Sequence, residues 1–398
     1  MSLSEISQPA DSSRPLTLAA EAAFVPIGIV TVLLGPLLPT LSARWSLNYT
    51  QAGSLFTVQF LASTLSVALS GLFISRWGFR FAIKAGLLAM TVGVAALPYS
   101  SRILGTICIG IYGAGLGLAV PADNLLVAAV HPLRRSTALN LLNFFWSVGA
   151  VACPFLVAAA TRRHQVPLLL VGFAGLLFLV ALGIAAMPSR IVEPRAVRVD
   201  GAMSLPRIAW RSNSVLLLAT LFFLYVGVEN SLGGWIASYA KTLGTWSLGL
   251  SLTVPSFFYS ALMVGRWLAS RLLHRVNEVA VARAGLLTAC AGMACLLLSH
   301  TLLSVFVGAS VAGIGLAAVY PITISLLSQE FGEAASRLGS LMFTMANLGG
   351  AFLPWLVGYS STRFGSLRAG MGVPLIAGVS MCALYLANWS SKPRETTF

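Results

Sequence analysis

Long runs of apolar residues, separated by short polar segments, fill almost the whole chain. Twelve of these runs reach the length of about 20 residues that a helix needs to cross the hydrocarbon core of a bilayer. Their expected limits are 16–41, 50–74, 81–99, 103–130, 136–160, 166–187, 215–240, 249–272, 279–299, 302–327, 338–361 and 370–389. The pattern therefore predicts an all-α membrane protein of twelve transmembrane helices.

The composition excludes an ordinary soluble protein. Hydrophobic residue types make up 57% of the 398 residues and charged types only 9%, whereas soluble domains carry about 25% charged residues. The net charge of +14 would suit a nucleic-acid partner. The basic residues, however, lie in the short segments between apolar runs, so we interpret them as topology signals and expect the bilayer, not nucleic acid, as the partner.

The distribution of Lys and Arg predicts the orientation in the membrane. If the N-terminus is cytoplasmic, the cytoplasmic segments hold more than twice as many basic residues as the opposite ones, which is the bias that cytoplasmic loops show. We therefore expect a cell (inner) membrane protein, monomeric, with both termini in the cytoplasm. The expected organisation is a tail at 1–15, a six-helix bundle at 16–187, a cytoplasmic linker at 188–214, a second six-helix bundle at 215–389 and a tail at 390–398.

An internal repeat relates the two predicted bundles. The segment Gly113–Pro121 (GAGLGLAVP) matches Gly313–Pro321 (GIGLAAVYP) at a constant offset, and the same offset superimposes Gly149 on Gly349. Chance identity in a Gly- and Leu-rich chain explains one such match but not a series that includes two prolines. Duplicated halves are typical of secondary transporters, in which the solute binds between the repeats near the midplane. The repeat therefore predicts two pseudo-symmetric bundles and a transport function.

Ionisable residues inside the apolar runs are expensive to bury and are candidates for function. Glu229 is the deepest of them, and Asn230 and Trp235 follow it closely. A carboxylate accepts hydrogen bonds from sugar hydroxyl groups while an aromatic ring covers the apolar face of a sugar, so this segment suits sugar binding. Burial also favours the neutral form of an acid, which suits proton carriage. A structural Glu bonded to a neighbouring helix is the alternative.

The other three ionisable residues, Glu21, Asp123 and Arg266, are expected nearer the cytoplasmic ends of their helices. Glu21 and Asp123 are further candidates for proton coupling. The expected depths place Glu229 too far from Arg266 for a direct pair, whereas Arg266 and Asp123 share a depth. Two interpretations remain open for Arg266: an ion-pair gate between the halves, or a pair within one half that only stabilises packing.

The chain resembles the major facilitator superfamily over nearly its whole length. The segment after the second span, GLFISRWGFR, fits that superfamily's signature at Gly71, Arg76, Gly78 and Arg80, which the resemblance assigns to gating. Ser75 stands where the signature has an acid, and Phe79 replaces an Arg. Because that acid helps to close the cytoplasmic side in the family, the resemblance implies a weaker or differently built latch here.

Two further segments resemble the fucose permease and glucose/galactose permease branch. They are Tyr225–Tyr239 (YVGVENSLGGWIASY) and the pair Gly265 and Arg266, which adds Gly265 to the gating candidates. The branch has acids in its first and fourth helices where this chain places Gly35 and Val120, although Asn124 matches a family asparagine. These departures put the branch's usual sugar and proton contacts in doubt.

The resemblance also indicates which polar residues can line a central cavity, because it assigns spans two, four, five, eight, ten and eleven to that cavity. The candidate substrate contacts besides Glu229, Asn230 and Trp235 are Gln59, Asn124, Asn143, Trp146, Tyr225, Tyr259, Tyr320 and Asn347. For each uncharged residue, a bond within the helix bundle or contact with lipid is at least as good an interpretation.

Several function classes can be set aside from the sequence. There is no Walker A motif, no metal-ligand spacing and no triad-like catalytic arrangement, so we expect no enzyme, no cofactor and no ATP-driven pump. The leading hypothesis is a proton-coupled sugar symporter that works by alternating access. A drug/proton antiporter is the alternative, because Gly149–Pro154 (GAVACP) partly resembles the antiporter motif of the fifth helix. A transceptor that no longer transports is a third hypothesis.

Overall fold

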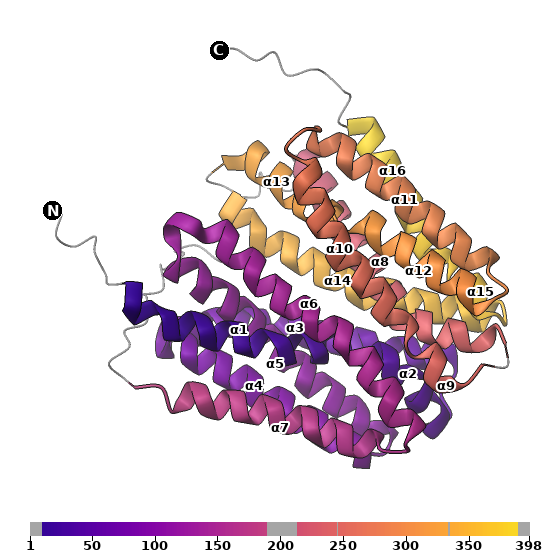
Figure 1. Cartoon of the computed structure of the whole chain (residues 1–398), viewed down its shortest axis with the longest axis horizontal. Helices are drawn as coiled ribbons and strands as arrows, with labels where there is room; N and C mark the ends of the chain where they lie inside the picture. Colours follow the sequence, from indigo (N-terminus) through magenta and orange to yellow (C-terminus); the bar gives the residue numbers. More distant parts are fainter. Residues whose placement is uncertain (1–9, 189–212, 245, 333–334, 389–398) are drawn as a thin grey trace, which may run out of the picture.

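The computed structural model describes residues 10–188, 213–244, 246–332 and 335–388, and every regular element in these ranges is a helix (Figure 1). Twelve helical stretches are long and apolar enough to cross a membrane, which confirms the predicted twelve spans. Residues 1–9, the predicted tail at 390–398 and most of the predicted linker at 188–214 lie outside the described residues. Residues 10–15, which were predicted as part of the tail, instead form the start of α1 (Ala10–Val32), so that the first helix begins earlier than predicted. The exact limits of the two bundles therefore stay a prediction.

The first half of the chain forms six spans. Its helices are α1 (Ala10–Val32), α2 (Leu34–Arg44), α3 (Tyr49–Trp77), α4 (Phe79–Ala96), α5 (Arg102–Val130), α6 (Arg135–Arg162) and α7 (Val166–Ala185), with short 3-10 turns at Leu97–Tyr99 and Pro132–Arg134. The second half forms the other six. Its helices are α8 (Asn213–Thr242), α9 (Leu248–Ser251), α10 (Val254–Leu272), α11 (Glu278–Leu298), α12 (Leu302–Leu316), α13 (Val319–Phe331), α14 (Ala335–Arg363), α15 (Leu367–Gly370) and α16 (Gly372–Asn388).

Four spans are built from two helices each, and a proline accompanies every break. Proline has no N–H group, and its ring collides with the carbonyl group four residues earlier. Accordingly α1 ends at Val32, four residues before Pro36. The other three breaks are similar: α9 ends at Ser251 before Pro255, α12 at Leu316 before Pro321, and α15 at Gly370 before Pro374. These spans cross the membrane as continuous apolar units, although their backbone hydrogen-bond ladder is interrupted.

Repeated glycines hold equivalent helices together in the two halves. A Cβ atom on Gly149 would collide with the backbone of α1, and one on Gly349 would collide with the backbone of α8. Likewise a Cβ on Gly113 would collide with α3, and one on Gly313 with α10. Small residues allow such close approach of membrane helices. The repeat in the sequence therefore corresponds to a repeat of helix pairs, as a pseudo-symmetric duplicated fold requires.

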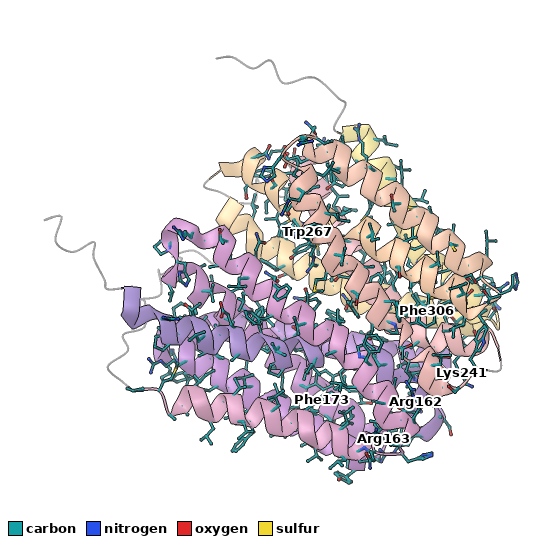
Figure 2. All side chains as sticks on the ribbon, viewed as in Figure 1. Arg162, Arg163, Phe173, Lys241, Trp267 and Phe306 are labelled. Carbon is teal, nitrogen blue, oxygen red and sulfur yellow. The ribbon has the colours of Figure 1, made fainter. Side chains whose placement is uncertain are left out.

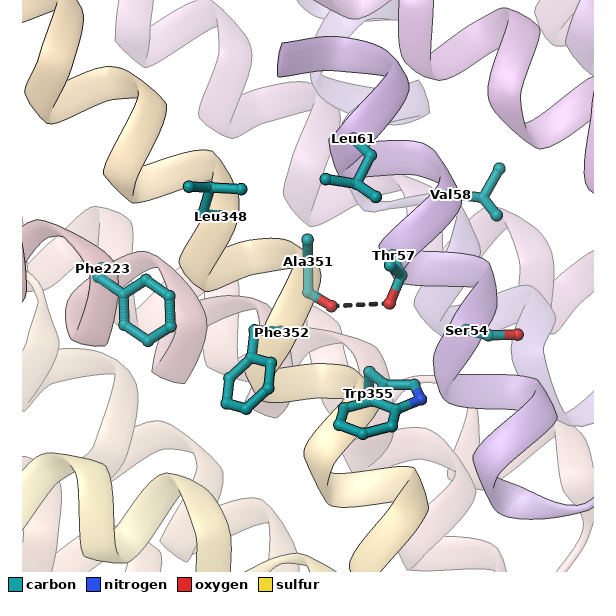
Figure 3. Close-up of a pocket in the computed structure, with 9 residues that line it drawn as sticks. All are labelled: Ser54, Thr57, Val58, Leu61, Phe223, Leu348, Ala351, Phe352 and Trp355. Carbon is teal, nitrogen blue, oxygen red and sulfur yellow. Dashed lines mark hydrogen bonds between the residues drawn. The ribbon is translucent and has the colours of Figure 1, made fainter. Parts of the chain in front are cut away.

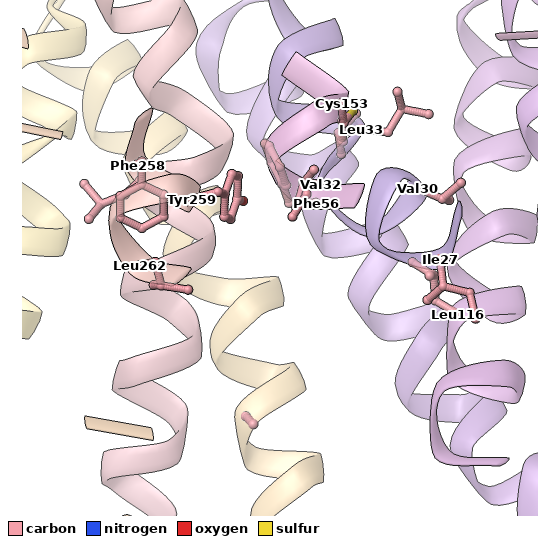
Figure 4. Close-up of a cluster of buried hydrophobic side chains, with 14 of the residues drawn as sticks. Ile27, Val30, Val32, Leu33, Phe56, Leu116, Cys153, Phe258, Tyr259 and Leu262 are labelled. Atoms are coloured by element: carbon pink, nitrogen blue, oxygen red, sulfur yellow. The ribbon is translucent and has the colours of Figure 1, made fainter. Parts of the chain in front are cut away.

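One continuous cluster of buried apolar side chains runs through both halves. In the close-up of Figure 4, Ile27, Val30 and Leu116 belong to the first half, and Phe258 and Leu262 belong to the second. Outside this cluster many large apolar side chains remain exposed. Lipid rather than water must cover such a surface, because exposed apolar area of this extent is rare on soluble monomers.

The two halves meet unequally along the bundle. We call the end where α1 begins and α16 ends the terminal side, and the other end the opposite side; in Figure 2, Arg162, Arg163 and Lys241 lie at the opposite side. Among the described residues, side-chain hydrogen bonds join the halves at three places, all in the middle or toward the opposite side. They are Thr50 to Thr362 (2.9 Å), Thr57 to the Ala351 carbonyl (2.9 Å) and Ser256 to the Val151 carbonyl (2.9 Å). The halves diverge toward the terminal side (Figure 1).

Candidate functional site

Glu229 lies in the middle of α8 at the centre of a cluster of aromatic and charged side chains. It is half-buried, and Tyr225 precedes it by one turn on the same face of the helix. Electrostatic interactions connect Glu229 with Tyr225, with Arg266 and Tyr259 of α10, and with Tyr320 of α13. Three elements of the second half therefore converge on one carboxylate group, and four of the residues predicted from the sequence accompany it.

The cluster contains polar groups whose hydrogen bonds are incomplete. The rings of Tyr225 and Tyr320 pack with centroids 5.3 Å apart. The Tyr225 hydroxyl interacts with both the Glu229 carboxylate and the Arg266 guanidinium. Among the described residues, however, neither this hydroxyl nor the Arg266 Nε reaches the geometry of a full hydrogen bond. A buried polar group without a partner costs about 1–3 kcal/mol. A polar ligand with several hydroxyl groups can recover that free energy here.

Arg266 acts electrostatically on Glu229 within the second half. Depth along the helices predicts no direct ion pair between the two residues, and that stays a prediction. The long side chain of Arg266 carries its charge away from its own helix, which explains an electrostatic effect on a residue at a different depth. Asp123 interacts with no charged group among the described residues. The ion pair between Arg266 and Asp123 is therefore not formed in this conformation.

Gly265, the other residue of the Gly-Arg pair, lies where α10 crosses α12. A Cβ atom added to it would come within 2.6 Å of the Ala317 Cβ and 3.1 Å of the Ile314 backbone. Its place in the structure is that of a packing residue, and it sets how closely α10 and the adjoining Arg266 approach α12.

An aromatic contact between the halves bounds the cluster toward the opposite side. Trp146 of α6 packs edge-to-face on Tyr259 of α10, with ring centroids 6.4 Å apart and an angle of 83°. The Trp146 indole N–H donates to the Thr31 hydroxyl (3.3 Å) at the end of α1. Gly233 of α8 leaves room for the Tyr259 hydroxyl, because a Cβ there would collide with it. The cluster around Glu229 is thus closed on this side by one residue from each half.

Two of the predicted contact residues are occupied elsewhere. Gln59 is 2% exposed and lies inside the first half, where it donates to the Thr31 carbonyl (3.3 Å) and accepts from the Tyr112 hydroxyl (3.1 Å). Trp235 is 1% exposed, and its N–H donates to the Pro354 carbonyl (2.9 Å). Neither side chain is accessible to a solute in this conformation.

Three of the four predicted asparagine contacts use their amide nitrogen in a hydrogen bond within their own helix. The side-chain amides of Asn124, Asn143 and Asn230 each donate to the carbonyl four residues earlier in the same helix, at 2.8 Å. This bond uses the amide nitrogen within the helix and orients the amide oxygen outward. Asn143 lies one turn from Trp146 on the same face of α6, so it faces the seam between the halves. Asn347 is half-buried in α14.

The two acids of the first half have very different surroundings. Asp123 of α5 is 0% exposed, and among the described residues neither of its carboxylate oxygens has a hydrogen-bond partner. Glu21 of α1 is half-buried and interacts electrostatically with His131 at the end of α5; His131 in turn shares a hydrogen bond of 2.8 Å with Thr17. Neither acid joins the cluster around Glu229.

The residues assigned to gating by resemblance surround the turn between α3 and α4. They are Gly71, Arg76, Gly78 and Arg80. Gly78 has φ of 85°, a conformation that favours glycine. Arg80 donates to the carbonyl groups of Met187 (3.4 Å) and Pro188 (3.2 Å), and so caps the end of α7. Ser75, which replaces the expected acid, bonds to a carbonyl of its own helix.

Sequence reasoning overlooked Thr31 and Tyr112. Thr31 accepts hydrogen bonds from Trp146 through its hydroxyl and from Gln59 through its carbonyl, and Tyr112 is buried against Gln59. The break before Pro36 is the signal that points to Thr31, because an interrupted helix frees backbone groups for side-chain partners. Among the described residues, no three His, Cys, Asp or Glu side chains lie close enough together to hold a metal ion.

Comparison with known proteins agrees with this architecture. The family model of the Major Facilitator Superfamily matches residues 22–354. A glucose/galactose transporter of Brucella abortus is 26% identical over 90% of this chain and 89% of its own length, and the human sodium-dependent glucose transporter 1 is 20% identical over 94% of this chain and 80% of its own. Among solved structures, a D-xylose–proton symporter has a TM-score of 0.77 at 17% identity, and the match covers 95% of this chain and 98% of that one.

These matches confirm the resemblance drawn from the sequence motifs, including the glucose/galactose permease branch. The family match covers most of the chain and includes both halves of the repeat. The helical architecture, the twelve spans and the duplicated helix pairs are those of the same fold. The chain therefore belongs to the Major Facilitator Superfamily, and it is a membrane transporter rather than an enzyme.

Proposed function

We infer that the protein is a secondary active sugar transporter, that it works by alternating access, and that it couples sugar movement to protons. The observation that carries this inference is the convergence of Tyr225, Tyr259, Tyr320 and Arg266 on Glu229, next to the seam between the halves. The similarity to a glucose/galactose transporter supports a sugar as the solute.

The chemistry of the cluster suits a polyhydroxylated ligand. A carboxylate accepts hydrogen bonds from sugar hydroxyl groups, and a guanidinium and phenol hydroxyls donate to sugar oxygens. Tyr259 is buried against Trp146 in this conformation. In this proposal the two rings separate when a sugar enters, and they then supply the aromatic surface on which the apolar face of the sugar packs. In this proposal, aromatic stacking is assigned to Trp146 and Tyr259 rather than to the buried Trp235.

Coupling to protons is assigned to Glu229. A charged Glu229 attracts the Arg266 guanidinium, which acts on it electrostatically. When the Glu229 carboxyl group is neutral, that attraction is lost and Arg266 can turn to a ligand. Binding of a proton and binding of a sugar thereby become linked through one side chain. Asp123 and Glu21 are secondary candidates for proton carriage. Sodium is the competing coupling ion, since one relative is a sodium-dependent glucose transporter.

The contacts between the halves support an assignment of the conformation. Hydrogen bonds join the halves in the middle and toward the opposite side, so solute access is proposed from the terminal side. With both termini in the cytoplasm of a cell with an inner membrane, as the Lys and Arg distribution predicts, this conformation is the inward-open one.

Uptake into proteoliposomes tests the proposal. Purified protein is reconstituted and supplied with labelled glucose, galactose, mannose, xylose or fucose under an inward proton gradient, an inward sodium gradient or neither. We expect accumulation of at least one sugar with the proton gradient. Glu229→Gln should reduce that accumulation at least tenfold. Sugar counterflow should persist in this variant, because counterflow needs no net proton movement.

Three results would contradict specific parts of this proposal. Unchanged accumulation by Glu229→Gln removes the coupling role of Glu229. Accumulation driven only by sodium replaces the proton as the coupling ion. Flux of amphipathic drugs with no sugar flux in any condition favours the antiporter alternative over sugar transport.

A further inference from the structure

A groove on the outer face of the protein runs between α3 of the first half and α14 of the second (Figure 3). It encloses about 560 Å³. Its lining is Ser54, Thr57, Val58, Leu61, Phe223, Leu348, Ala351, Phe352 and Trp355. None of these residues belongs to the cluster around Glu229, so the groove is a separate feature of the molecule.

The chemistry of the lining favours an apolar occupant. The two hydroxyl groups in it are already used: Thr57 donates to the Ala351 carbonyl (2.9 Å) at the floor of the groove (Figure 3), and Ser54 donates to the Gln51 carbonyl (2.7 Å). The remaining lining side chains are aliphatic or aromatic. A sugar or an ion would lose its hydration here and could find only the Trp355 indole N–H as a side-chain partner, which is costly.

The position of the groove points to the bilayer as the source of its occupant. Leu61 is 41% exposed and Phe352 is 45% exposed, although both lie well inside membrane-spanning stretches. Phe223, which also lines the groove, precedes Tyr225 by two residues and so lies on roughly the opposite face of α8 from the cluster around Glu229. The groove therefore faces away from that cluster. Hydrocarbon chains are the medium at that depth.

The groove is formed jointly by the two halves. Val58 and Leu61 come from the first half, and Phe223, Phe352 and Trp355 come from the second. A ligand that fills the groove contacts both halves. The two walls of the groove move apart when α3 and α14 separate. From the lining, the exposure and the shared walls we propose that one acyl chain of a membrane phospholipid binds in this groove and favours the conformation in which α3 and α14 are in contact.

This proposal does not depend on the identity of the solute or of the coupling ion. It adds a bilayer lipid as a ligand that is bound at the seam. A ligand that binds one conformation better than another shifts the equilibrium toward the conformation it prefers. The rate of the cycle should therefore depend on the acyl chains of the surrounding membrane.

Fluorescence quenching by brominated phosphatidylcholine tests the proposal, because Trp355 lies in the lining. The contribution of Trp355 is the difference between the parent protein and Trp355→Phe in liposomes with increasing fractions of brominated lipid. Trp267 is 57% exposed on α10 outside the groove and serves as the control for ordinary lipid contact. We expect quenching of Trp355 to saturate at low brominated fractions, whereas quenching of Trp267, measured through Trp267→Phe, should rise in proportion to the fraction.

Filling the groove provides a matched comparison. Ser54→Leu adds an apolar side chain to the groove, and Ser380→Leu makes the same change at an exposed serine of α16 whose hydroxyl also bonds within its helix. We expect Ser54→Leu to lower the quenching of Trp355 at least twofold and Ser380→Leu to leave it unchanged. Leu348→Phe is a second filling variant should Ser54→Leu fail to fold, and it should give the same decrease.

Two outcomes would overturn the proposal. If Trp355 and Trp267 are quenched in the same proportional manner, or if the filling variants match Ser380→Leu, the groove holds only ordinary boundary lipid. The conformational part has its own test. A Cβ at Gly358 would collide with the Tyr49 carbonyl of α3, so Gly358→Ala should separate α3 from α14 and reduce the saturating quenching. Unchanged quenching in that variant would show that binding is independent of the contact between the halves.

Discussion

Trp146 of the first half and Tyr259 of the second half meet edge-to-face, with their ring centroids 6.4 Å apart, directly beside the cluster around Glu229. Through this contact, the separation of the two halves is linked to the occupancy of the site beside Tyr259. A solute that inserts next to Tyr259 must displace or reorient one of these rings, and the halves cannot part on the opposite side while both rings stay in contact.

The first prediction concerns the coupling between these two rings. Aromatic pairs of this geometry contribute about 0.5–1.5 kcal/mol beyond the area they bury. The free energy of unfolding in detergent is measured for the parent, Trp146→Ala, Tyr259→Ala and the double variant. The interaction free energy from this double-mutant cycle should lie in that range. The pair Phe144 and Tyr259, whose contact does not occur in this conformation, is the control cycle. If the double variant loses as much free energy of unfolding as the two single variants together, the two rings do not interact and the prediction is wrong.

The second prediction concerns Arg266 and Glu229. Arg266→Gln leaves the half-buried carboxylate without its cation, and Glu229→Gln leaves the guanidinium without its anion, each at a cost of about 1–3 kcal/mol. The double variant Glu229→Gln/Arg266→Gln should be more stable than Arg266→Gln alone, because neither charge is left unmatched. Thermal melting of the three variants measures this. A double variant that melts at the temperature expected from adding the two single effects would show that the residues act independently.

The third prediction separates glycines at the seam from glycines within a half. A Cβ on Gly358 meets the Tyr49 carbonyl across the seam, whereas a Cβ on Gly113 meets the Gln59 carbonyl within the first half. Overpacking at either place costs about 1–3 kcal/mol. Gly358→Ala can escape the collision by parting the halves, so it should remain folded and should change the conformational equilibrium. Gly113→Ala has no such escape and should lower the melting temperature instead.

Labelling of a cysteine introduced for Thr50 by a membrane-impermeant maleimide measures that equilibrium, because Thr50 lies in the contact with Thr362. In the Gly358→Ala background the labelling rate should rise at least threefold, and in the Gly113→Ala background it should match the parent. Equal rates in all three proteins would show that the seam glycines do not control the conformation.

The fourth prediction concerns Asp123. Because this carboxyl group is fully buried and has no hydrogen-bond partner among the described residues, its charged form is expensive. Asp123→Asn removes the possibility of a charge at nearly constant volume, so the variant should melt at or above the temperature of the parent near neutral pH. A decrease of several degrees would show that the carboxylate has a partner in the folded protein. Proton-driven uptake by the same variant then reports whether Asp123 takes part in coupling.

Much of the fold follows from the sequence. Apolar runs of spanning length determine that the helices cross a membrane, since unpaired backbone groups and exposed charges are too costly in hydrocarbon. The repeated glycines at 113 and 313 and at 149 and 349 determine which helices approach closely, because only a residue without a side chain leaves room for a neighbouring backbone. A proline follows each interruption of a span, because its ring excludes the carbonyl four residues before it. Pro121, Pro154 and Pro354 lie inside unbroken helices, however, so the sequence alone does not tell which proline interrupts a span.

Which residues surround Glu229 was decided by the tertiary structure. Glu229 could be selected from the sequence because an acid in an apolar run is rare, but its partners could not. Helix depth paired Arg266 with Asp123, whereas in the packed bundle the Arg266 guanidinium acts on Tyr225 and Glu229. Trp235 follows Glu229 closely in the chain, yet the helix turns it away and buries it against Pro354. The direction in which a side chain points depends on how a helix is rotated against its neighbours, and only the packed bundle decides that rotation.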